Sequence, residues 1–230
     1  MIEWAAAGAI GGAAWAVRGR SSAVFGPSVW RGDRARRAIA LTFDDGPSES
    51  TAEILRVLES YGAKATFFQC GAHAERLPEE ARAVSAAGHE IGNHTYTHAR
   101  LWLRSAAYVR AEVERGQVAL ERVHGRAPRL FRAPYGVRWF GLREVQRRLG
   151  LTGVMWTALG RDWKLPGESV AGRLLGSCRN GAIFCLHDGR MMEARPDVRN
   201  TVEAVKRLVP KLVEEGWKLE TVSQLLRAST

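Results

Sequence analysis

The chain has 230 residues, of which 46% are hydrophobic and 25% charged, proportions ordinary for a soluble globular protein with room for one sizeable core. The formal net charge is +10, but the arginines are spread over the whole chain without a basic stripe that alternates with aromatics, so no nucleic-acid partner is expected. Three cysteines without a C-x-x-C pair exclude a disulfide framework and a thiolate zinc site, and they are interpreted as inert buried thiols.

The first twenty residues contain an apolar run from Trp4 to Val17, followed by Arg18 and Arg20. The run is shorter than the roughly 20 residues of a membrane span, and no positive charge precedes it as in an export signal. A weak membrane anchor through residues 4–17, an uncleaved export signal and a helix packed on the domain are the alternatives. We expect a bacterial-type cell envelope or secreted location, with the cytoplasm as the other alternative. Residues 21–37 are polar and predicted to be a linker.

From residue 38 onward, apolar runs of strand length alternate with segments of helical spacing, several of which end at glycine. This pattern predicts parallel strands joined by crossover helices in one α/β domain over residues 38–228. About seven such units favour a (β/α) barrel, complete or incomplete, although patterning alone does not separate a barrel from an open sheet. Pro210 should kink or interrupt the last long helix. The expected strands are 38–43, 65–71, 89–94, 129–136, 151–158 and 182–188, and the expected helices are 51–62, 77–88, 106–125, 139–150, 168–178 and 201–216.

Reactive side chains follow several of these strands at the end where each strand stops. In a β/α barrel the C-terminal ends of the strands meet on one face, and that face carries the active site. A shared active site explains this coincidence better than stability does. The residues concerned are Asp44 and Asp45, His94 and His98, Arg132 and Tyr135, Asp162 and Trp163, and His187 and Asp188.

The two histidines His94 and His98 are four residues apart, which places both imidazoles on one side of a helix or tight turn. Two histidines and one carboxylate form a common open zinc site. Either Asp44 or Asp45 would supply the carboxylate, and a divalent cation would relieve the repulsion between these adjacent acids. We therefore expect one divalent metal ion, with zinc first and cobalt, nickel or manganese as alternatives.

Two adjacent acids can then have two functions. One binds the metal, while the other accepts a proton from a metal-bound water whose pKa the cation lowers. Arg132 could hold this base, His187 could protonate the leaving group, and a backbone N–H around Tyr135 could stabilise an oxyanion. Together these groups form a set suited to hydrolysis of an amide or ester.

The sequence resembles the polysaccharide deacetylase family, the NodB homology domain of carbohydrate esterase family four. Its five motifs are matched in order over roughly Ala38 to Leu226. The matching stretches are TFDDGPS (42–48), HTYTH (94–98), RAPYG (132–136), RDW (161–163) and LHD (186–188).

This resemblance implies a distorted (β/α) barrel and a hydrolase acting on carbon–nitrogen bonds other than peptide bonds. It also implies removal of N-acetyl groups from GlcNAc-containing carbohydrate of the peptidoglycan or chitooligosaccharide type. It assigns the roles of the motif residues as follows: Asp44 is the general base, Asp45, His94 and His98 are the metal ligands, Arg132 orients the base, the Tyr135 backbone N–H faces the oxyanion, His187 is the general acid, and Trp163 and Leu186 line the acetyl pocket.

One position departs from the family pattern. Many members carry an acid three residues before the Asp-Trp pair to support the catalytic histidine, and here that position is Leu159. Either Asp162 supports His187 instead, or His187 has no carboxylate partner, which would lower its pKa. Two other functions remain open: a deacylase or deformylase acting on an O-acetyl or lipid-linked amino sugar, and a catalytically retired sugar-binding domain. The oligomeric state is not predicted.

Overall fold

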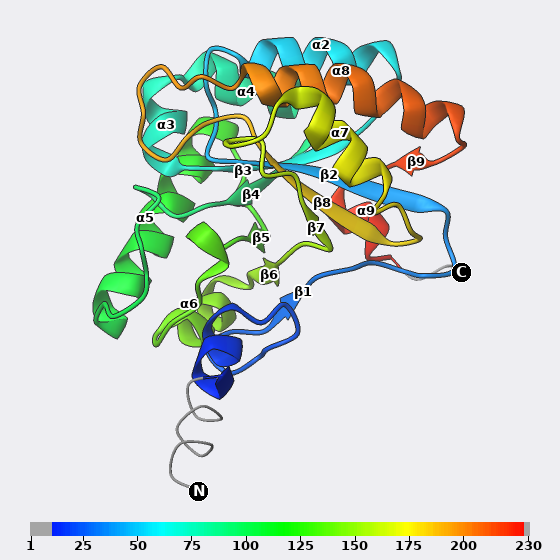
Figure 1. The fold of residues 1–230 in the computed structure, drawn as a ribbon. Helices are drawn as coiled ribbons and strands as arrows, with labels where there is room; N and C mark the ends of the chain where they lie inside the picture. Colours follow the sequence, from blue (N-terminus) through cyan, green and yellow to red (C-terminus); the bar gives the residue numbers. More distant parts are fainter. Residues whose placement is uncertain (1–10, 228–230) are drawn as a thin grey trace, which may run out of the picture.

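A computed structural model of the chain describes residues 11–227. Its strands form one parallel sheet in the order β1-β6-β5-β4-β3-β2-β8-β7, and β9 pairs separately with β2. The path stays open between β1 and β7 in the described residues, so the fold is an incomplete, distorted (β/α) barrel, as predicted (Figure 1). The strands are β1 Ser28–Val29, β2 Ala38–Asp44, β3 Ala65–Gln69, β4 Glu90–Asn93, β5 Leu130–Phe131, β6 Thr152–Val154, β7 Ala158–Leu159, β8 Ala182–His187 and β9 Lys218–Leu219.

Helices connect the strands and cover the outside of the sheet. Figure 1 shows α2, α7 and α8 along the side of β2 and β8, with the chain's N-terminal helix beside α6. Residues 11–18 form that first helix. The others are α2 Thr51–Ser60, α3 Gly71–Arg76, α4 Pro78–Ala86, α5 Ala106–His124, α6 Leu142–Leu149, α7 Gly167–Leu175, α8 Arg199–Glu214 and α9 Val222–Leu225, with a 3-10 turn η1 at Pro134–Gly136.

The central strand β2 is buried on both faces, and its two faces have different neighbours. Ile39, Leu41 and Phe43 pack with the apolar sides of the covering helices in the larger core. Ala38 and Ala40 face a second core that α9 closes at the opposite end of the barrel from the active-site face. Because side chains alternate along a strand, Thr42 and Asp44 continue this inner row. The interior is therefore apolar at one end of β2 and polar at the end where the reactive residues gather.

Several details differ from the expected elements, and three of them concern the course of the chain. The stretch 151–158 forms two short strands, β6 and β7, with Met155, Trp156 and Thr157 between them. The predicted strand 65–71 ends at Gln69, and a short helix, α3, follows at once. Helix α8 continues through Pro210, so the proline does not interrupt it.

The N-terminal segment contacts the barrel at several points. β1 pairs with β6, the Val17 carbonyl accepts a hydrogen bond from the Arg138 N–H at 3.1 Å, and Arg20 Nη1 donates to the Thr157 carbonyl at 2.6 Å. Residues 4–10 of the predicted apolar run lie outside the described residues. Between residues 11 and 227, no helix combines the length and apolar character needed to cross a bilayer.

Candidate active site

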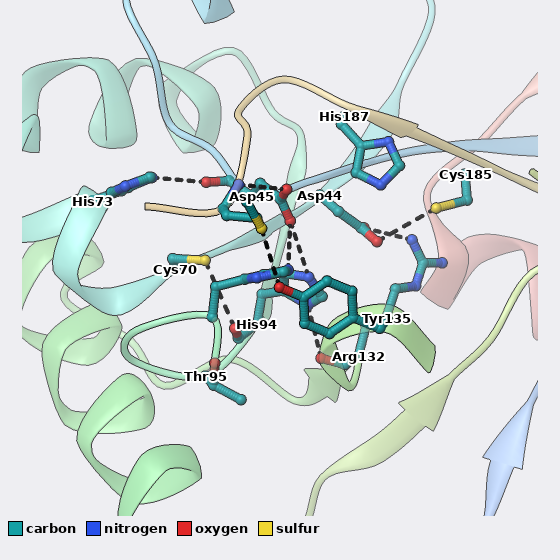
Figure 2. A network of polar contacts seen from close by, with 12 residues as sticks. Asp44, Asp45, Cys70, His73, His94, Thr95, Arg132, Tyr135, Cys185 and His187 are labelled. Atoms are coloured by element: carbon teal, nitrogen blue, oxygen red, sulfur yellow. Dashed lines mark hydrogen bonds and ion pairs between the residues drawn. The ribbon is translucent and has the colours of Figure 1, made fainter. Parts of the chain in front are cut away.

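Asp44 and Arg132 form a buried ion pair at the polar end of the barrel interior. Arg132 Nη1 lies 2.6 Å from Asp44 Oδ1 and 2.7 Å from Thr42 Oγ1, while its Nε donates to the Val154 carbonyl at 3.2 Å. Arg132 is fully buried and Asp44 nearly so. These contacts fix one carboxylate oxygen of Asp44, and the other accepts a longer contact of 3.4 Å from the Cys185 thiol (Figure 2).

Asp45 reaches the same cavity as Asp44 because the backbone turns at this residue. On a regular strand two neighbouring side chains point to opposite faces. Asp45 has φ 74°, in the left-handed region, which aspartate tolerates better than most residues. The following turn packs closely against Asp188, since a Cβ on Gly46 would lie 2.2 Å from Asp188 Oδ2. The two adjacent acids therefore both line one pocket.

His94 and His98 meet Asp45 at the candidate metal centre. The Nε2 atoms of His94 and His98 lie 3.2 and 3.1 Å from Asp45 Oδ1, an oxygen with no hydrogen-bond partner among the described residues. All three side chains are buried. Burial opposes the charge of Asp45, but the two imidazoles and the nearby His187 hold its pKa well below the usual range.

The donor set fits a bound zinc ion. Zinc lies about 2.0–2.2 Å from imidazole nitrogens and carboxylate oxygens, so ligand atoms of a tetrahedral site are about 3.3 Å apart, close to the observed 3.1–3.2 Å. His94 Nδ1 contacts the Arg132 carbonyl at 2.8 Å, which orients the ring and leaves Nε2 for the metal. Asp45, His94 and His98 could therefore hold one divalent ion.

His187 lies at the end of β8, across the pocket from the metal ligands, and its partner is Asp162. The two side chains meet at 2.9 Å between Nδ1 and Oδ1, and Asp162 Oδ2 also accepts from the His187 N–H at 2.7 Å. Burial opposes the imidazolium, but Asp162, with Asp45 and Asp44 farther away, raises the pKa of His187 to about 10. The contact with Asp162 thus favours the protonated form of His187.

Tyr135 and Trp163 complete the walls of the pocket, whose volume is about 570 Å³. Tyr135 has φ 58° and ψ 10°, and its ring meets His98 edge-on at 4.7 Å between centroids. Trp163 meets the His187 ring in the same manner at 5.1 Å and remains half exposed. The pocket brings together a cluster that could hold a metal ion, a carboxylate paired with an arginine, a histidine paired with a carboxylate, and an apolar wall. Such a combination suits hydrolysis of an acyl group.

Comparison with known proteins decides the family. A profile described as "Polysaccharide deacetylase" matches residues 31–154. A chitooligosaccharide deacetylase of Azorhizobium caulinodans is 36% identical over 192 residues, which cover 80% of this chain and 91% of that protein. A peptidoglycan-N-acetylglucosamine deacetylase of Bacillus cereus is 34% identical over 203 residues, 86% of this chain and 92% of that protein.

The chain belongs to the polysaccharide deacetylase family. The fold agrees as well, because a solved structure of a peptidoglycan N-acetylglucosamine deacetylase superimposes with a TM-score of 0.80. That structure is 29% identical and covers 87% of this chain and 92% of its own chain. Of the two alternatives left open by Leu159, the structure shows the first, because Asp162 is the carboxylate that contacts His187.

One residue expected in the acetyl pocket lies elsewhere in this polysaccharide deacetylase. Leu186 is fully buried in the outer core and does not line the pocket. The reason is the alternation along β8, since Cys185 and His187 face the pocket and the residue between them must face the helices. The other residues to which the motifs assign a role line the pocket, except Arg132, which lies directly behind Asp44. Asp188 is fully buried outside the pocket lining, where it accepts a hydrogen bond from the Thr51 hydroxyl.

Sequence reasoning also missed several residues of the site. Cys185 contacts Asp44, and Thr201 Oγ1 donates to Asp162 Oδ2 at 2.7 Å. The position of Cys185, two residues before His187 on the same strand, was a usable signal. Arg18 and Arg190 line the pocket too, and no motif marks either of them.

Proposed function

We propose that this chain is a metal-dependent N-deacetylase of GlcNAc-containing carbohydrate, of the chitooligosaccharide or peptidoglycan type. The observation that carries the proposal is the juxtaposition of Asp44, held by Arg132, with the Asp45–His94–His98 cluster. The names of the two curated relatives, which act on these polymers, support the substrate class.

Asp45, His94 and His98 would hold the divalent ion, with zinc as the first candidate because of the donor set. Such an ion supplies Lewis acidity and lowers the pKa of a bound water. Asp44 would take a proton from the attacking water, and the contact of 2.6 Å between Arg132 and one Asp44 oxygen supports this role. The pair with Arg132 orients the carboxylate of Asp44.

His187 would donate a proton to the departing amine as the carbon–nitrogen bond breaks. Its partnership with Asp162 favours the protonated form that this role needs. The backbone N–H of Tyr135 would face the oxyanion that develops on the acyl oxygen. Trp163 would contact the acetyl methyl group, which is small and apolar and gains from the exclusion of water.

The test measures acetate released by the full chain from N-acetylated chitooligosaccharide and from peptidoglycan. Samples are assayed as purified, after chelation, and after chelation followed by added zinc. We expect acetate release that chelation removes and zinc restores, and that Asp44→Asn reduces by at least about 100-fold. Formate release in place of acetate would favour a deformylase. Tight binding of either polymer by the zinc-loaded protein without any release would favour a retired sugar-binding domain.

A further inference from the structure

The pocket contains two arginines that the proposed reaction does not use. Arg18, at the end of the N-terminal helix, and Arg190, in the loop after β8, line it together with the metal ligands and His187. Neither side chain makes an ion pair or hydrogen bond within residues 11–227. Their guanidinium groups are therefore available to a ligand.

The acids of the pocket already have partners of their own. Asp44 is paired with Arg132, Asp45 lies against two imidazoles, and Asp162 pairs with His187. These contacts leave no carboxylate in the pocket to neutralise Arg18 or Arg190. Asp197 lies near Arg190, but it is exposed and engages Arg199 through both carboxylate oxygens.

Arg18 is held at the pocket by its immediate neighbours in the chain. Arg138 is buried, and its backbone N–H donates to the Val17 carbonyl at 3.1 Å. The guanidinium of Arg138 donates to the Gly19 carbonyl and, at 2.6 Å, to the Ser22 carbonyl. The residues on both sides of Arg18 are thus bound by one buried arginine, which fixes the backbone at Arg18.

Arg190 is also held in position by its two neighbours in the chain, Gly189 and Met191. The Met191 N–H donates to Asp45 Oδ2 at 2.9 Å, and a Cβ on Gly189 would lie 2.6 Å from the Asp45 backbone. Both neighbours of Arg190 therefore pack on a metal ligand. The backbone positions of the two arginines are fixed before substrate arrives, which reduces the entropy lost on binding.

We propose that Arg18 and Arg190 bind an anionic substituent of the substrate, a carboxylate or a phosphate carried by the sugar that is deacetylated or by its neighbour. Guanidinium groups bind both anions through paired hydrogen bonds, whereas a neutral sugar leaves their charge unmatched. This inference rests on the proposed function, and it adds that the preferred substrate is negatively charged next to the acetamido group.

The test measures equilibrium binding by calorimetry, with Asp44→Asn as a background that binds zinc and sugar but turns over slowly. The ligands are a neutral GlcNAc oligosaccharide, a glycan of the same length with carboxylate-bearing N-acetylmuramic acid, and a GlcNAc 1-phosphate ester. We expect at least one anionic ligand to bind about tenfold more tightly than the neutral one. Arg18→Gln and Arg190→Gln should each remove most of that preference, and Arg18→Lys should keep part of it.

Arg34→Gln is the matched control, because it removes the same charge from an exposed site in the N-terminal segment outside the pocket. It should leave the anionic preference unchanged. If both anionic ligands bind no more tightly than the neutral one, or if Arg34→Gln has the same effect as Arg18→Gln, the inference is wrong. If only one anionic ligand loses affinity in the arginine variants, that ligand identifies the preferred anion as a carboxylate or a phosphate. Acetate release by the zinc-loaded wild-type chain tests the proposed function separately from this preference.

Discussion

Asp162 contacts His187 at 2.9 Å between Oδ1 and Nδ1, so the histidine has a carboxylate partner although position 159 is a leucine. Asp162 is buried and also accepts a hydrogen bond from the Thr201 hydroxyl. This second contact fixes the orientation of the carboxylate. Burial opposes the charge of Asp162, but His187 holds its pKa below the usual value. The pair therefore carries opposite charges at neutral pH, and His187 has a proton to donate.

The first prediction concerns Asp162→Asn. The Asp162 charge raises the pKa of His187, and the protonated histidine is the active form, so loss of the charge should move the alkaline limb of kcat/KM to lower pH. The Asp45 charge contributes to the His187 pKa of about 10, and a bound cation neutralises part of that charge. The alkaline limb of the wild-type pH profile should therefore lie below about pH 10. At neutral pH we expect kcat to fall about 10- to 100-fold.

The pH profile of acetate release checks this, with thermal unfolding to show that the variant folds. Glu53→Gln is the control, because it removes one negative charge from a surface pair with Lys206 and should leave the profile unchanged. An alkaline limb at the same pH in Asp162→Asn and wild type would show that Asp162 does not set the protonation of His187.

The sequence predicted the fold well where burial imposes a clear period. β2, β8 and α5 have runs of apolar residues at strand or helix spacing, and their bounds were found within a residue or two. The short elements were missed because they carry no such period. α3 has six residues directly after an apolar strand, and the apolar residues between β6 and β7 continue the strand pattern although the chain leaves the sheet there.

The motifs predicted the chemistry of the site but not all of its geometry. The prediction that Leu186 lines the pocket was wrong because a motif gives only the order of residues along the chain. Which residues of β8 reach the pocket depends on the side of the strand on which each side chain lies. The partnership of Asp162 with His187 joins positions 25 residues apart, and no local pattern reports such a contact. Arg18 follows an apolar run for which a membrane anchor, an export signal and a packed helix were the alternatives. The contacts of its neighbours Val17 and Gly19 with Arg138 show where it lies.

The second prediction is that zinc stabilises the fold through the Asp45–His94–His98 cluster. A ligand at about 100 times its Kd adds about 2.7 kcal/mol to the free energy of unfolding, and in a chain of this size each kcal/mol raises Tm by about 2–4 °C. We therefore expect chelation to lower Tm by about 5–11 °C and zinc to restore it. Differential scanning fluorimetry measures this shift.

His98→Ala should abolish the zinc-dependent shift, because it removes one of three ligand atoms. His124→Ala is the control, since His124 contacts Gln69 and Ser85 away from the pocket. That variant should keep the shift even if its Tm is lower. Equal shifts in both variants would place the stabilising zinc elsewhere.

The third prediction concerns the buried Arg138, which binds the N-terminal segment to the barrel. Arg138→Met removes the side-chain hydrogen bonds to the carbonyls of Gly19 and Ser22, and of the two only that of Gly19 keeps another donor, the Ser22 N–H at 2.9 Å. We therefore expect the free energy of unfolding to fall by about 3 kcal/mol. Urea denaturation measures the loss, and trypsin should cleave after Arg18 or Arg20 faster than in wild type. Arg34→Met should change neither by a measurable amount, and rapid cleavage in both variants would count against the role of Arg138.

The fourth prediction compares two glycines in helices. Gly116 of α5 lies against the loop that carries His94 and His98, and a Cβ there would be 2.7 Å from the Thr95 carbonyl carbon and 2.9 Å from Asn93 Oδ1. Gly172 of α7 has no atom within 4 Å of its Cβ position. Alanine is preferred over glycine in a helix by about 1 kcal/mol, so propensity alone predicts that both substitutions stabilise.

Packing should turn the expected gain in stability into a loss at Gly116 only. Gly116→Ala must displace backbone of the histidine loop, and overpacking of this kind costs about 1–3 kcal/mol, so we expect a less stable protein with weaker zinc binding. Gly172→Ala should be more stable by up to about 1 kcal/mol with unchanged zinc affinity. Urea midpoints and zinc titrations measure both effects. If Gly116→Ala were as stable as Gly172→Ala, the close packing of α5 on the histidine loop would not be needed to hold the metal ligands in place.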